Sequence, residues 1–354
     1  MQRFFIVIAL SVFIVSSCIK EPGPLIIDTE RSYLAGEGFF ITNEGNFRTG
    51  NGSLSFFSYD SMKLFNNVFR EVNHRPLGDI PYSMVFRGDR AYIVVNNSGK
   101  IEVVKSTDIK SAGVINGLNS PRCFSPVSDS KAYVSSLYSD SVTIIDLSSN
   151  TISGYIDIKK TSESICNNGS FSYIASWVGG NKIMVVDNAA DIVTDSIEVG
   201  YEPESMVIDR NGTLWVLCNG GWQREHFAEL IAINTFRNEI EKRFVFPSVD
   251  DSPTCLQIDG RGEVLYFLMK GVRKMPVGSS ALPSSAFIAE SQHAFYKLGI
   301  NPKNNDIIVT DAGDYTGRGI MLRFSSSGEP KSESLSGIIP GAVSFREMPG
   351  HVTD

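Results

Sequence analysis

One short pattern recurs along almost the whole chain and limits what the chain can fold into. Each copy reads Pro-x-x-apolar, then an Asp, Asn or Gly turn, an apolar β-like run, a polar turn and a second apolar run. Successive copies start 40, 41, 41, 50 and 42 residues apart. A repeat of this length, built from short strands, predicts a β-propeller with one blade per copy. The six complete copies begin at Pro81, Pro121, Ser162, Pro203, Pro253 and Phe295.

The seventh copy is divided between the two ends of the chain. Residues 340–345 supply only the first strand of a unit, and residues 38–45 and 53–60 resemble the later strands. Joining the two ends would complete a blade and hide both terminal sheet edges. We therefore predict an all-β fold, a seven-bladed β-propeller over residues 38–346. Each blade is expected to have four strands, with one blade closed by the N- and C-terminal strands.

The local chemistry agrees with this fold. Residues 92–95 and 142–145 are β-branched and aromatic runs, and turns such as residues 96–99 consist of Asn, Ser and Gly. Helical periodicity is nearly absent. The main alternative is a pair of β-sandwiches, which would require a linker in mid-chain, and the sequence has none there.

The N-terminus has the layout of an export signal. A short region at 1–3, made basic by Arg3, precedes an apolar segment at 4–15, and Ser16, Ser17 and Cys18 follow. This segment resembles the lipobox of bacterial lipoproteins, which implies lipidation of Cys18; the alternative is an ordinary secretory signal with an incidental cysteine. We expect a signal peptide at 1–17, the lipidated Cys18 with a flexible tether at 18–37, and a C-terminal tail at 347–354. The protein would then be exported and anchored by lipid alone to the outer membrane, at the cell surface.

Charge and cysteine content restrict the partners. The net charge of −7 argues against nucleic acid, and against binding an anionic lipid surface by charge alone. Cys123, Cys166, Cys218 and Cys255 remain after Cys18, and none forms a CxxC pair, so a zinc site has no support. We expect four buried free thiols and no cofactor.

The repeat also indicates which face would bind a ligand. If the first strand of each unit runs from one face to the other and the second returns, the start of the first strand and the loop after the second share a face. Aromatic rings among amide and charged groups there would suit a bulky ligand with apolar faces and polar edges. Alternatively, these rings cap the core. Trp215, inside a second strand, is expected in the core. The candidate ligand-binding residues are Asn43, Phe47, Arg48, Tyr82, Asn97, Arg122, Tyr138, Trp177, Glu204, Trp222, Tyr296 and Tyr315.

Catalytic motifs are absent from the sequence, which contains no GxSxG, HExxH or P-loop. Glu163 and Glu204 start equivalent strands in adjacent units, so paired carboxylates could hold a metal or act as acid and base. Alternatively, the Glu-Ser pair belongs to the repeat itself. His226 is the one histidine expected on the proposed binding face, where a solvated role is the simpler interpretation. We expect a binding protein and not an enzyme, with no metal.

The repeat resembles the YVTN/YncE-like and surface-layer propellers over residues 38–346. The last unit, FYKLGINPKNNDIIVTDAGDY to PGAVSF, is similar to propeller lipoproteins of Bacteroidota, which include the cobalamin-capturing BtuG proteins. That resemblance implies capture of cobalamin, as a ligand and not as a cofactor, beside a TonB-dependent transporter. Two other functions stay open: a lactonase-like hydrolase or lyase, and a protein-interaction scaffold.

Overall fold

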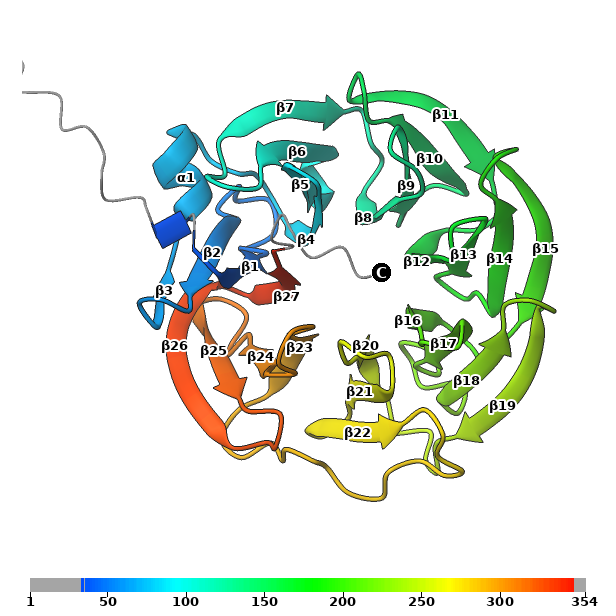
Figure 1. The fold of residues 1–354 in the computed structure, drawn as a ribbon. Helices are drawn as coiled ribbons and strands as arrows, with labels where there is room; N and C mark the ends of the chain where they lie inside the picture. Colours follow the sequence, from blue (N-terminus) through cyan, green and yellow to red (C-terminus); the bar gives the residue numbers. More distant parts are fainter. Residues whose placement is uncertain (1–32, 35, 347–354) are drawn as a thin grey trace, which may run out of the picture.

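The computed structural model describes residues 33–34 and 36–346, and seven antiparallel sheets in this part of the chain surround a central axis (Figure 1). The predicted seven-bladed β-propeller is confirmed. Blades are numbered from the one that contains both ends of the chain. Blade 1 consists of β27 (Pro340–Phe345), β1 (Gly38–Asn43), β2 (Ser53–Ser58) and β3 (Lys63–Phe65), from axis to rim. A short helix, α1 (Val68–Asn73), connects it to blade 2.

The other six blades follow one another along the chain. Blade 2 consists of β4 (Pro81–Arg87), β5 (Arg90–Val95), β6 (Lys100–Lys105) and β7 (Ser111–Asn116), and blade 3 of β8 (Pro121–Pro126), β9 (Lys131–Ser136), β10 (Ser141–Asp146) and β11 (Thr151–Asp157). Blade 4 consists of β12 (Ser162–Asn167), β13 (Phe171–Ser176), β14 (Lys182–Asp187) and β15 (Ile192–Glu198), and blade 5 of β16 (Pro203–Ile208), β17 (Thr213–Cys218), β18 (Glu229–Asn234) and β19 (Glu239–Val245). Blade 6 consists of β20 (Thr254–Ile258), β21 (Val264–Leu268) and β22 (Val272–Pro276), and blade 7 of β23 (Phe295–Ile300), β24 (Ile307–Asp311), β25 (Arg318–Phe324) and β26 (Pro330–Ile338).

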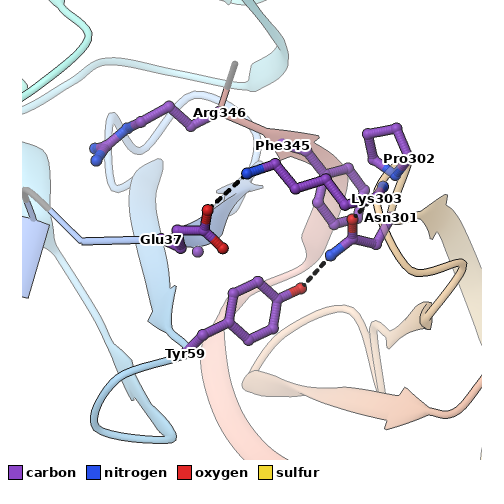
Figure 2. Close-up of a pocket in the computed structure, with 8 residues that line it drawn as sticks. Glu37, Tyr59, Asn301, Pro302, Lys303, Phe345 and Arg346 are labelled. Atoms are coloured by element: carbon purple, nitrogen blue, oxygen red, sulfur yellow. Dashed lines mark hydrogen bonds and ion pairs between the residues drawn. The ribbon is translucent and has the colours of Figure 1, made fainter. Parts of the chain in front are cut away.

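The ring closes as predicted. Strand β27 pairs with β1, with Val343 opposite Ile41, so the two ends of the chain form one sheet. Side chains reinforce the seam between blades 1 and 7, as Figure 2 shows: Lys303 Nζ lies 2.6 Å from Glu37 Oε1, and Asn301 Nδ2 donates to Tyr59 Oη at 2.7 Å. Burial raises the pKa of Tyr59 to about 12.

Blade 6 departs from the expected four strands. After β22 the chain runs through residues 277–294 without a fourth strand, and its β-pairing with the sheet is a single bridge between Val272 and Ile288. Glycine, proline and several serines fill this segment, and these residues favour turns over a ladder. The repeat pattern identified the blade but not its missing outer strand.

The core lies between neighbouring blades. Tyr173 and Val185 of blade 4 pack against Met206 and Val216 of blade 5, and similar clusters join the other blades. Trp215 is 1% exposed and its Nε1–H donates to Asp209 at 3.0 Å, so the core position predicted for it is confirmed. Each blade is thus stabilised by the apolar surface that it buries against its neighbours.

The expected signal peptide at 1–17, Cys18, most of the expected tether and the tail at 347–354 lie outside the described residues. Just before β1, Leu34 is buried and the ring of Tyr33 stacks on that of Phe65, with centroids 3.9 Å apart. In the described part of the chain, no helix is long and apolar enough to cross a membrane.

Candidate functional site

The two faces of the propeller differ in what they contain. One face contains the starts of the innermost strands and the loops between the second and third strands, and we call it the loop face. The other contains the tight turns between first and second strands, and we call it the turn face. Loops on one face of a rigid scaffold commonly bind ligands. The seven innermost strands are β27, β4, β8, β12, β16, β20 and β23 (Figure 1).

At the centre of the ring lies a cavity of about 240 Å³, here called the axial cavity. It is built from the two variable residues of each Pro-x-x-apolar copy. The first variable residue lines the cavity in four consecutive blades, as Tyr82, Arg122, Glu163 and Glu204. The second lines it in all seven blades, as Ser83, Cys123, Ser164, Ser205, Cys255, Lys297 and Ala342.

A β-bulge explains why two consecutive residues face the axis. Side chains normally alternate between the faces of a strand, but the pairing register shifts at the start of each innermost strand, for example between Pro81 and Ser83 and between Pro203 and Ser205. A bulge leaves one residue unpaired and redirects its side chain, and such bulges are frequent beside active sites. The preceding backbone is strained too, because the β-branched Ile80 has a φ of 58°. Its carbonyl accepts a hydrogen bond from Asn96 N at 2.8 Å, which ties the strained turn to the loop beside it.

One side of the axial cavity contains a tightly bonded cluster of three residues. Arg122 donates to both oxygens of Glu163, at 2.7 Å from Nε and 2.9 Å from Nη2, and the Tyr82 hydroxyl donates to Glu163 Oε1 at 2.6 Å. The guanidinium also lies 3.6 Å from the centroid of the Tyr82 ring. Burial opposes the charge of Arg122, but Tyr82 and Glu163 raise its pKa above the ordinary value. This cluster is therefore neutral overall and fixed in place.

The other side of the cavity is less fully bonded. Glu204 Oε2 accepts a hydrogen bond from Cys255 N at 2.9 Å. The Lys297 amine lies 5.7 Å from the centroid of the Tyr82 ring and 5.4 Å from that of Tyr296. Burial opposes its charge, but Tyr82, Cys255 and Glu204 raise the pKa of Lys297 well above its usual range, so the amine is protonated at neutral pH.

The four cysteines after Cys18 are free, as predicted, although Cys123 and Cys166 are half-buried and only Cys218 and Cys255 are fully buried. Burial raises the pKa of Cys123 and of Cys255 to about 11 and that of Cys166 to about 12. Because the thiolate is the reactive form, these thiols are poor nucleophiles near neutral pH.

Around the axial cavity, large aromatic side chains project from the loops into solvent. Trp222 is 92% exposed, Tyr138 72%, Phe47 62% and Tyr315 53%. Trp177 is half-buried in the corresponding loop of blade 4. Among the described residues, the exposed aromatic side chain on the turn face is Phe236, accompanied by the aliphatic Met62 and by Ile192, which begins β15 directly after a turn.

The structure gathers most of the predicted residues on the loop face but separates them into two groups. Tyr82, Arg122 and Glu204 line the axial cavity. Tyr296 lies beside it, where its hydroxyl donates to Glu44 Oε1 at 2.8 Å and its ring meets that of Tyr315 edge-on, with centroids 5.6 Å apart. The remaining members lie on the outer loops, with the Arg48 guanidinium over the Phe47 ring at 5.0 Å and Asn97 bonded to Asp79.

Asn43 is the exception among the predicted residues. Its side chain is fully buried inside blade 1, where it donates to Ser53 and Ser55 and accepts from Ser336 Oγ and Gly337 N. These four bonds join β1 and β2 to β26 of blade 7. Asn43 therefore fastens the ring and has no surface for a ligand, which corrects its assignment as a ligand-binding residue.

Within residues 33–34 and 36–346, no three His, Cys, Asp or Glu side chains are placed to hold a metal ion. Glu163 is bonded to Arg122 and Tyr82, and Glu204 is bonded to the backbone of blade 6, so the two carboxylates have different hydrogen-bond partners within the one cavity. His226 is exposed and its ring lies 4.4 Å from that of Tyr201.

Sequence reasoning missed Lys297 and the other second variable residues. The signal was present in the repeat, because the two x positions of Pro-x-x-apolar vary in residue type, whereas the residue after them stays apolar and the residue before them is proline in five of the seven copies. It also missed the pairing of His293 Nδ1 with Asp311 Oδ2 at 2.9 Å, which joins residues far apart in sequence and has no local pattern.

Comparison with known proteins agrees with the fold. Residues 37–335 match the family model described as Domain of unknown function (DUF5074). No curated protein matches the chain.

Three solved structures resemble this chain. A quinonprotein alcohol dehydrogenase-like protein from Bacteroides thetaiotaomicron is 13% identical, with a TM-score of 0.68 over 88% of this chain and 78% of that one. A candidate 6-phosphogluconolactonase from Bacteroides fragilis is 11% identical, with a TM-score of 0.64 over 88% and 98%. A streptogramin B lyase is 13% identical, with a TM-score of 0.55 over 71% and 81%. At such low identities the likeness shows a shared propeller fold and says nothing about the chemistry of the site.

Proposed function

This chain belongs to the family of domains of unknown function called DUF5074, and we propose that it binds a bulky ligand on its loop face. The observation on which this proposal depends is that exposed aromatic side chains are more numerous on the loop face than on the turn face. Phe47, Tyr138, Trp222 and Tyr315 come from four different blades and project from the same face. Exposed aromatic side chains do not stabilise the core, whereas a contiguous set of them is typical of a binding surface.

Hollows beside these loops support a ligand larger than the axial cavity can hold. One of about 320 Å³ lies beside the loop that contains Trp222, between Tyr201, His226 and Phe227. A second of about 330 Å³ adjoins it through Asn181. Both fall within the usual size range of small-molecule sites, about 300–1,000 Å³. A broad ligand could cover several loops and place parts of itself in these hollows.

Cobalamin is the ligand that we propose to test first. A corrin is flat and apolar on its faces and carries polar groups at its edge, which suits aromatic rings interspersed with amide and charged groups. The resemblance of the last repeat to propeller lipoproteins that capture cobalamin supports the same choice. Binding, and not catalysis, is proposed because Glu163 is already neutralised by Arg122 and no nucleophile with a lowered pKa lines the described part of the cavity.

The proposed location follows from the N-terminal sequence. A lipid on Cys18 would hold the propeller at the outer membrane, where it could pass its ligand to a TonB-dependent transporter. Metabolic labelling with an alkyne-tagged fatty acid tests the anchor, and we expect label on the wild-type chain but not on Cys18→Ala. Equal labelling of both chains would contradict it.

Calorimetric titration with cyanocobalamin tests the function. We expect binding by the wild-type chain and at least a tenfold weaker Kd for Trp222→Ala, because a stacked ring contributes about 1–3 kcal/mol. Phe236→Ala is the matched control, since Phe236 is 96% exposed on the turn face and Trp222 is 92% exposed on the loop face. If no heat of binding is measured, cobalamin is excluded as the ligand. If Trp222→Ala and Phe236→Ala lose affinity equally, the loop face is excluded as the binding surface.

A further inference from the structure

The axial cavity contains a cation, the Lys297 amine, that forms no direct ion pair in the described part of the chain. Among the described residues, no carboxylate oxygen lies within ion-pair distance of the Lys297 amine, and its contacts are the two tyrosine rings described above. The other six residues at the same position of the repeat are serine, cysteine or alanine, so the lysine is the one long side chain at this level of the cavity. Lys297 is half-buried, so its ammonium is partly desolvated and available to pair with an anionic group of a ligand.

Negative charge is also present in the cavity, which restricts the ligand further. Glu204 Oε2 is bonded to Cys255 N, but its Oε1 accepts no hydrogen bond from a described residue. Glu163 is neutralised by Arg122, and Glu44 lies at the rim on the Tyr296 hydroxyl. A simple anion would pair with Lys297 but would be repelled by the two unpaired carboxylates. A ligand that carries both charges would satisfy Lys297 and Glu204 together.

We propose that the axial cavity binds a small zwitterion of the α-amino acid class, with its carboxylate on Lys297 and its protonated amine on Glu204. This goes beyond the proposed function, because the site is lined by residues of the innermost strands and does not use the exposed aromatic loops.

Two hydroxyl groups complete the site. Ser205 Oγ already accepts from Leu256 N at 2.8 Å, so its proton is free to be donated to the ligand carboxylate. The Ser164 hydroxyl, at the same level of the repeat, bonds to no described residue. The cavity volume of about 240 Å³ exceeds the roughly 150 Å³ of a cavity that binds benzene, which is enough for a small or medium amino acid.

The test is calorimetric titration of the full chain, purified in detergent, with each of the proteinogenic amino acids. We expect at least one to bind. Its analogue without the amine and its analogue without the carboxylate, propionate and ethylamine in the case of alanine, should each bind at least about tenfold more weakly, because a charge-assisted hydrogen bond contributes about 1.5–3 kcal/mol.

Variants assign the binding to the axial cavity. Lys297→Met and Glu204→Gln should each raise the Kd at least about tenfold, and Glu204→Gln keeps an acceptor for Cys255 N. Lys303→Met is the matched control, because Lys303 pairs with Glu37 on the turn face, and it should leave the Kd unchanged. Circular dichroism confirms that each variant is folded.

Three results would overturn the proposal. Either no amino acid binds, or the analogue without the amine binds as tightly as the amino acid itself, or Lys297→Met binds the amino acid as tightly as the wild-type chain does. The cobalamin titration is read separately, because Trp222→Ala should weaken cobalamin binding and leave amino-acid binding intact. Failure of one proposal is thereby distinguished from failure of the other.

Discussion

Removing Arg122 alone should destabilise the protein more than removing Arg122 and Glu163 together. The two side chains are 17% and 8% exposed and share hydrogen bonds of 2.7 and 2.9 Å. Arg122→Met leaves Glu163 Oε2 without a donor and Oε1 with only the Tyr82 hydroxyl. Breaking a buried pair costs about 3–5 kcal/mol, and the retained Tyr82 bond places the expected loss near about 3 kcal/mol.

The double variant Arg122→Met/Glu163→Leu removes the stranded charge, so its stability should lie within about 1 kcal/mol of wild type. Urea unfolding and thermal melting measure both, and a loss of about 3 kcal/mol corresponds to a fall of about 5 °C in Tm for a domain of this size. Arg87→Met is the control, because its partner Asp129 is fully exposed, and it should cost less than about 1 kcal/mol. The reasoning is refuted if Arg122→Met costs under about 1 kcal/mol, or if the double variant loses as much stability as Arg122→Met does.

Three further predictions concern residues with other roles. Asn43→Ala should lower stability by about 2 kcal/mol, because it leaves the buried Ser336 hydroxyl without its acceptor, while cobalamin affinity stays unchanged; a loss of affinity at unchanged stability would contradict this. Stability should fall from about pH 8.5 upwards, because burial raises the pKa of Cys123 and Cys255 to about 11 while an unfolded thiol titrates near about 8.5, and it should fall more steeply above about pH 10, where unfolded tyrosine titrates while burial raises the pKa of Tyr59 and Tyr266 to about 12; denaturant midpoints across this range check the sign. In the Cys18→Ser chain, a charged thiol reagent at pH 8 should label the four remaining cysteines only after unfolding, and rapid labelling of the native protein would show that a thiol is reactive.

The sequence predicts the scaffold well because every blade repeats the same requirement. Each innermost strand must begin at the loop face, run beside the axis to the turn face and pack on the neighbouring blade. The apolar positions therefore recur at a fixed spacing in the sequence. Closure by residues 340–345 followed from the same count and is confirmed by the pairing of Val343 with Ile41. Blade 6 escaped prediction because its missing strand leaves no mark in the repeat that precedes it.

The sequence predicted some residues of the axial cavity and missed others. Tyr82, Arg122 and Glu204 were assigned to the loop face from the repeat, and they line the axial cavity. Lys297 was overlooked because side chains alternate along a strand, which would place Lys297 on the opposite face from Tyr296. The β-bulge that turns Lys297 towards the axis depends on backbone pairing, which has no signal in the sequence. Asn43 was misassigned because the end of a strand looks exposed in sequence, whereas its partner strand β26 arrives from the other end of the chain.

The most direct test of the loop face as the binding surface is oxidative footprinting, which compares the modification of exposed side chains with and without cyanocobalamin. We expect Trp222, Tyr138 and Phe47 to be protected, and Phe236 on the turn face and Tyr155 on the rim to be modified at unchanged rates. Protection of Phe236 or Tyr155, with the loop-face aromatic side chains unaffected, would contradict the account.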